Sequence, residues 1–101
     1  MKMMNPAAMS RFTVLREAAQ KIHRLSPPVR MMEQPPHKNR NTASVALEFP
    51  TPLVVLNSSI RQALSSLIGQ CDTMQTDKTD IGVCFTFTVS EIWISDKPNQ
   101  T

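Results

Sequence analysis

The stretch from Val83 to Ile94 constrains the fold more than any other part of this sequence. Apolar residues occupy every second position from 83 to 89, and small polar residues fill the positions between them. This alternation, rich in β-branched and aromatic side chains, predicts a strand with one buried and one solvated face. Because a lone strand is not stable, the stretch requires partner strands from this chain or from another chain.

The alternation changes phase near the end of this stretch. Ile92 and Ile94 lie on even positions, whereas the earlier apolar residues lie on odd positions. A continuous strand cannot keep one buried face through such a shift. We therefore expect either a bulge at about 89–91 or two strands that meet at a bend.

Residues 10–25 have the pattern of an amphipathic helix. Ser10 is a candidate N-cap, and the apolar residues that follow recur at spacings of three and four. The apolar stripe consists of Phe12, Leu15, Ala19 and Ile22. The basic residues of the same segment are Arg11, Arg16, Lys21 and Arg24. Pro27 and Pro28 end the helix, because a residue that precedes proline is pushed out of helical geometry.

The remainder of the chain divides into three parts. Residues 26–45 contain two proline pairs and a polar run, which predicts a disordered linker. Residues 46–95 combine apolar runs with a helix pattern at 59–68, where Ser59 opens a capping box and Gly69 marks the end. We expect a loop at 70–81 and a short tail at 96–101.

Within residues 46–95, Pro50 and Pro52 argue against a central strand before Leu53. The apolar run 53–56 fits a buried strand or the approach to a helix. The predicted fold class is therefore α+β. It consists of a basic N-terminal helix (1–25), a proline-rich linker (26–45) and a small helix-plus-strands unit (46–95).

Charge is distributed unevenly along the chain. Residues 1–45 carry eight basic and two acidic residues, a net charge of +6, whereas residues 46–101 carry three basic and six acidic residues, a net charge of −3. This asymmetry indicates a basic arm that contacts an acidic surface. The surface could belong to nucleic acid, anionic lipid, another protein or the acidic half of the same chain.

No motif in the sequence points to catalysis, a cofactor or a metal. The candidate metal ligands are His23, His37, Cys71 and Cys84, and their spacing fits no compact ligand pattern. With two glycines in the whole chain, a glycine-rich phosphate loop is not expected. No apolar run approaches the roughly 20 residues of a membrane span. We therefore expect a protein that is not an enzyme, binds no cofactor and has no transmembrane segment.

The main functional hypothesis is a small non-catalytic interaction module. Its contacts come from the helix stripe and from the C-terminal strand, and its partner is another protein or a second copy of itself. The predicted partner-binding residues are Phe12, Leu15, Ala19, Ile22, Phe85, Phe87 and Trp93. The predicted basic contacts are Arg11, Arg16, Lys21 and Arg24.

Three alternatives remain open at this stage. The first 25 or so residues, which are basic, amphipathic and poor in acids, fit a mitochondrial import presequence; without such import, the cytoplasm is the expected compartment. Nucleic-acid binding through residues 24–40 is disfavoured, because no aromatic residue lies among the basic ones. The chain could also be a reading frame without a selected function.

Overall fold

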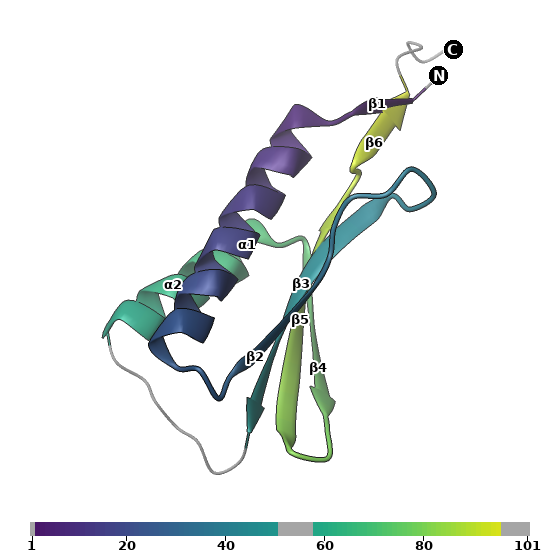
Figure 1. Cartoon of the computed structure of the whole chain (residues 1–101). Helices are drawn as coiled ribbons and strands as arrows, with labels where there is room; N and C mark the ends of the chain where they lie inside the picture. The colour runs from purple at the N-terminus through teal and green to yellow at the C-terminus, as the bar shows by residue number, and fades with distance from the viewer. Residues whose placement is uncertain (1, 51–57, 96–101) are drawn as a thin grey trace.

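The computed structural model describes residues 2–50 and 58–95 and shows an α+β protein (Figure 1). The predicted fold class is therefore confirmed at this level. In chain order the elements are β1 (Lys2–Met4), α1 (Pro6–Leu25), β2 (Arg30–Gln34), β3 (Thr42–Pro50), α2 (Ser58–Gln70), β4 (Thr73–Lys78), β5 (Gly82–Ser90) and β6 (Trp93–Ser95). The apolar run 53–56 lies outside the described residues.

A four-stranded antiparallel sheet forms the centre of the molecule, with the strand order β2-β3-β5-β4. Both helices lie on the same face of this sheet (Figure 1). The chain runs twice through a helix followed by a hairpin, first as α1-β2-β3 and then as α2-β4-β5. The second strands of the two hairpins, β3 and β5, pair in the middle of the sheet. Each half of the chain thus contributes one helix, one inner strand and one edge strand.

Helix α1 begins earlier than the sequence pattern predicts. The N-cap is Asn5 rather than Ser10, and the Asn5 side chain accepts a hydrogen bond from the backbone N–H of Ala7 at 3.2 Å. Pro6 occupies the first helical turn, where its missing N–H costs nothing. The helix ends at Leu25 as predicted, ahead of the two prolines.

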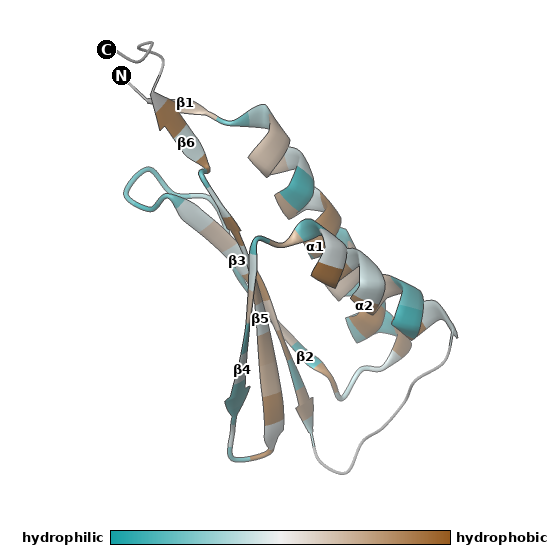
Figure 2. Cartoon of the chain, turned by 180° about the vertical axis from the view of Figure 1, so that it is seen from behind, coloured by the Kyte–Doolittle hydropathy of each residue, from teal (hydrophilic) through white to brown (hydrophobic). Residues whose placement is uncertain are grey.

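The core lies between the two helices and the sheet. Helix α1 supplies Ala8, Phe12, Leu15, Ala18, Ala19 and Ile22, all of which are buried. Strand β3 supplies Ala43, Val45 and Leu47, strand β5 supplies Phe87 and Val89, and helix α2 supplies Ile60, Ala63 and Leu67. The strand contributions fall on odd positions, as expected for one face of a pleated sheet. Figure 2 shows hydrophobic colour along β5 and hydrophilic colour at the far end of β4.

The phase change in the C-terminal stretch is a bend between two strands, which confirms one of the two expectations. Strand β5 ends at Ser90, and Glu91 adopts a left-handed conformation with φ of 57°. Ile92, an even-numbered residue, is therefore buried like the odd-numbered Phe87 and Val89 of β5. Two asparagines hold the bend: the backbone N–H of Asn5 donates to the Ile92 carbonyl at 2.8 Å, and the Trp93 N–H donates to Asn41 Oδ1 at 2.8 Å.

Strand β3 is an inner strand that reaches Pro50, so the expectation of no central strand before Leu53 is wrong. Two further regions differ from the expected layout. Within residues 26–45, expected as a disordered linker, lie the whole of β2 and the first residues of β3. Within residues 70–81, expected as a loop, lies β4. In both regions the edge strand is mostly exposed on its two faces, so its apolar residues do not alternate. Pairing with an inner strand, rather than burial of a face, keeps these residues extended.

The helix predicted at 59–68 is present as α2, and it extends to Ser58 and Gln70. Gly69, expected just beyond the helix, lies inside its last turn. The backbone N–H of Cys71 still donates to the Leu67 carbonyl at 3.1 Å. The helical hydrogen-bond pattern therefore continues past the glycine.

We expect the two glycines to respond to alanine substitution with opposite signs. A Cβ at Gly82 would overlap the Phe49 carbonyl oxygen and would lie 2.9 Å from the Pro50 Cα. Both atoms belong to the backbone of β3. Gly82→Ala should therefore destabilise the fold by about 2 kcal/mol or more. Gly69→Ala meets nothing within 4 Å and should stabilise α2 by about 0.5–1 kcal/mol. Urea unfolding of the two variants checks this, and equal shifts would contradict it.

Candidate interaction surface

Strand β4 has an open hydrogen-bonding edge, which we call the β4 edge: the side of Thr73–Lys78 that faces away from β5. All six residues of β4 are exposed. Strand β5 pairs with its inner side over six residue pairs. Among residues 2–50 and 58–95, no strand pairs with its outer side. An unpaired row of backbone N–H and C=O groups is a template for another extended chain.

The register shows which backbone groups point outward. Thr79 and Gly82 close the β4–β5 hairpin, with the Thr79 N–H donating to the Gly82 carbonyl at 2.9 Å. In an antiparallel strand, successive residues direct their N–H and C=O groups alternately toward one neighbour and the other. Because the Thr79 N–H points toward β5, the odd-numbered residues of β4 (73, 75 and 77) also direct their N–H and C=O groups toward β5. The outward groups are those of Met74, Thr76 and Lys78.

The opposite edge of the sheet, at β2, is less accessible to a partner strand. Proline pairs at 27–28 and 35–36 flank β2, and proline has no N–H to donate. The Arg40 guanidinium also donates a hydrogen bond to the Pro35 carbonyl at 2.7 Å, so this acceptor is already used. No proline lies in or next to β4. The β4 edge is therefore the better candidate for strand pairing.

The sheet face opposite the helices carries mainly small and polar side chains. On the inner strands these are Ser44, Ala46 and Glu48 of β3, and Cys84, Thr86, Thr88 and Ser90 of β5. Arg30 of β2 lies beside Glu48 in the register, and its guanidinium is 3.5 Å from the carboxylate. In the described residues this face has short side chains on most positions of its inner strands, and Met32 of β2, which is 43% exposed, lies beside Ala46 in the register.

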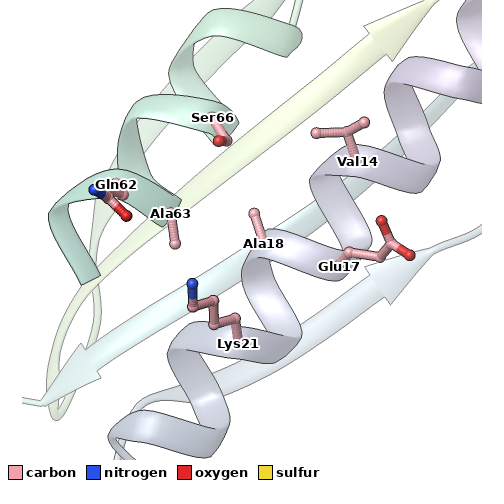
Figure 3. Close-up of a pocket in the computed structure, with 7 residues that line it drawn as sticks. All are labelled: Val14, Glu17, Ala18, Lys21, Gln62, Ala63 and Ser66. Carbon is pink, nitrogen blue, oxygen red and sulfur yellow. The ribbon is translucent and has the colours of Figure 1, made fainter. Parts of the chain in front are cut away.

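A shallow groove of about 300 Å³ runs between the two helices and opens to solvent (Figure 3). Its lining residues are Val14, Glu17, Ala18 and Lys21 of α1, and Gln62, Ala63 and Ser66 of α2. Ala18 and Ala63 point into the space between the helices (Figure 3). Glu17 and Lys21 are the ionisable residues of the lining, and both lie on α1. The groove therefore does not place an ionisable side chain of α2 opposite one of α1.

The structure places the predicted partner-binding residues mainly inside the molecule. The helix stripe of Phe12, Leu15, Ala19 and Ile22 packs in the core, as does Phe87. In this conformation these side chains do not reach a partner.

Phe85 and Trp93 are partly buried. The Phe85 ring packs edge-on against Phe49, with ring centroids 5.7 Å apart. The Trp93 ring packs against the core, and its Nε1–H donates to the His37 carbonyl at 2.8 Å. The predicted partner-binding residues therefore do not form one continuous surface.

The predicted basic contacts are dispersed, and the front half of the chain folds onto its own acidic half. The Arg11 guanidinium lies 3.2 Å from the Asp72 carboxylate, which also accepts the Ser90 N–H at 2.7 Å. This pair and the Arg30–Glu48 pair each join the basic half to the acidic half.

The other basic residues of α1 lie in different surroundings. Arg16 lies over the Phe12 ring at 6.0 Å, and Lys21 lines the groove. Arg24 is exposed near the end of the helix. The four predicted basic contacts therefore do not gather into one patch.

The two thiols are free and separate. Burial raises the pKa of the Cys71 thiol, so the thiol stays protonated at neutral pH and is a weak nucleophile. In the described part of the chain, no group of three or more His, Cys, Asp or Glu side chains is placed to hold a metal ion.

Sequence reasoning missed β4, although one signal for it was present. The strand predicted from residue 83 onward needs a partner, and a short turn at Asp80–Ile81 precedes it. A turn of that length before a strand implies a hairpin whose first arm lies in the polar residues 73–78. Because that arm is polar, it shows no alternation of apolar residues.

The fold and this edge define the class: a small α+β protein with a four-stranded antiparallel sheet, covered by helices on one face. Comparison of the chain with protein-family models, with curated proteins and with solved structures finds no match. In the described residues, neither helix is long and apolar enough to span a bilayer.

Proposed function

We propose that this chain is a non-catalytic interaction protein that binds an extended segment along its β4 edge. The observation that carries the proposal is the one-sided pairing of β4, whose six residues are all exposed. Strand addition to such an edge derives its affinity from main-chain hydrogen bonds. The side chains on alternate positions then supply specificity.

The composition of β4 supports a role in pairing. Natural edge strands are commonly protected by prolines, bulges or a central charge. Strand β4 has its two charged residues, Asp77 and Lys78, at one end, and Thr73 to Thr76 carry none. Four consecutive uncharged residues thus lie along an edge that no described element covers.

Backbone methylation of a model peptide tests this binding mode. The probe is a fluorescent extended peptide of alternating Thr and Val, titrated against the full chain by polarisation. Strand addition uses the N–H groups of every second peptide residue. A peptide N-methylated at alternate residues keeps one unmethylated edge that it can turn toward β4, whereas a peptide N-methylated at every residue keeps none. We expect the first peptide to bind and the second to lose binding; binding of the fully methylated peptide would contradict the proposal.

Substitution of Thr76 tests the same edge from the protein side. Because the Thr76 N–H points outward, Thr76→Pro removes no β4–β5 hydrogen bond, and proline is tolerated at such edge positions. We expect peptide affinity to fall by about tenfold or more, since the lost donor and the ring both oppose pairing. Thr76→Ala is the matched control, because it changes the side chain and keeps the N–H. Equal affinities for the two variants would count against the β4 edge.

A further inference from the structure

We infer that the segment bound at the β4 edge is β4 of a second copy, paired antiparallel about a two-fold axis at Gln75. This inference names the partner of the proposed function and rests on it. The pairing joins two four-stranded sheets into one continuous sheet of eight strands. A two-fold contact of this kind closes on itself, whereas β4 against β2 of another copy would propagate into a filament.

The outward backbone groups of β4 are complementary to themselves. With Gln75 opposite its own copy, Met74 lies opposite Thr76 of the second copy, and Thr76 lies opposite the second Met74. These are residues whose N–H and C=O groups point outward, so each of the two pairs forms a hydrogen-bonded ring. Gln75 then occupies a non-hydrogen-bonded site, where the two Cα atoms come closest.

The side chains favour this register through charge. Lys78 comes beside Asp72 of the second copy, and the symmetry produces this ammonium–carboxylate pair twice. Asp72 lies just before β4, where its own N–H donates to the Thr88 carbonyl at 2.8 Å, so the pairing with Lys78 is through the side chains alone. Asp72 already accepts from Arg11 and from the Ser90 N–H, and a carboxylate has about four acceptor sites. The Asp72 side chain is 40% exposed, which leaves it reachable. A register shifted to place Thr76 on the axis instead sets Lys78 opposite Met74 and loses both pairs.

The remaining side chains also find partners on the two faces. On the face opposite the helices, Thr73 lies opposite Asp77 of the second copy and can donate its hydroxyl to that carboxylate. The two Gln75 amides lie side by side at the axis. On the helix side, Met74 is 49% exposed in the single chain. In the pair, the two Met74 side chains lie diagonally across the axis, within reach of long side chains.

Edge pairing alone buries less surface than the roughly 800 Å² per partner of a standard interface. We therefore expect a dimer whose population depends on concentration. Sedimentation of the full chain should show the monomer giving way to dimer as the concentration rises toward about 1 mM. Thr76→Pro should remain monomeric over the same range, whereas Thr76→Ala should dimerise.

A single cysteine at the axis tests the register. In a Cys71→Ser, Cys84→Ala background that unfolds cooperatively, Gln75→Cys places two thiols on Cα atoms about 4.5 Å apart, a spacing that a disulfide spans. Asp77→Cys is the matched control on the same strand and face, where the two Cα atoms are about 14 Å apart. We expect a covalent dimer from Gln75→Cys under mild oxidation and none from Asp77→Cys.

Three results would overturn the inference. They are a chain that stays monomeric at about 1 mM, equal cross-linking at positions 75 and 77, and cross-linking of Thr76→Cys in place of Gln75→Cys. If the alternating peptide still binds and Thr76→Pro still weakens it, the second copy is rejected and strand addition stands. If neither peptide nor copy pairs with the edge, the proposed function fails as well.

Discussion

Removal of residues 1–25 is expected to abolish cooperative unfolding. Helix α1 supplies six of the sixteen apolar residues that are buried in the described part of the chain. Burial of its three largest, Phe12, Leu15 and Ile22, contributes about 1.5–3 kcal/mol each. A protein of this size has a total stability of about 5–15 kcal/mol. The truncated chain should therefore lack a sigmoidal thermal transition by circular dichroism.

Removal of residues 1–4 alone is the matched control. It deletes β1, whose Met3 and Met4 are exposed, and it leaves the Asn5 cap and the whole of α1 in place. We expect this shorter truncation to retain a cooperative transition. A two-state, monomeric transition in the chain without residues 1–25 would show that the rest of the molecule folds alone. The import-presequence alternative requires that result, because a processed chain would have lost α1.

Phe87→Ala should be among the most destabilising single substitutions in the sheet. Phe87 is 1% exposed on an inner strand, in the middle of the core face. Truncation of a buried phenylalanine to alanine costs about 3–5 kcal/mol, because it combines lost burial with a cavity. Urea unfolding should show the loss as a lower midpoint with an unchanged slope.

Phe85→Ala provides the comparison, because Phe85 has the same residue type, strand and face. Its ring is partly exposed and packs on Phe49 at the margin of the core. We expect less than half of the Phe87→Ala effect. A larger loss at Phe85 than at Phe87 would contradict the position of the core derived from the register.

The sequence predicted three of the elements that bury an apolar face. The stripe of α1, helix α2 and strand β5 each carry a period that matches their geometry, and each was found within a few residues of its observed bounds. The bend at Glu91 was also foreseeable, because the change of parity between Val89 and Ile92 requires one. These features depend on burial, and burial leaves a pattern in the sequence.

The edge strands left no such pattern. Strand β2 lies between proline pairs, and β4 reads as a polar loop, so their extended conformation comes from hydrogen bonds to β3 and β5. Strand β3 did carry a signal, with Ala43, Val45 and Leu47 on odd positions, but Pro50 at its end argued against a strand. The proposed β4 edge belongs to the part that the sequence concealed, since an interaction through backbone atoms requires no particular side chain.

Because the unit of one helix and one hairpin occurs twice, the chain is an intramolecular complex of two halves. Nine residue pairs between β3 and β5, together with the contact of α1 with α2, hold the halves together without a covalent bond. The peptide link between Pro50 and Ser58 sets the effective concentration at which one half meets the other. Cutting the chain between residues 50 and 58 would therefore turn the docking of one half on the other into an association that depends on concentration.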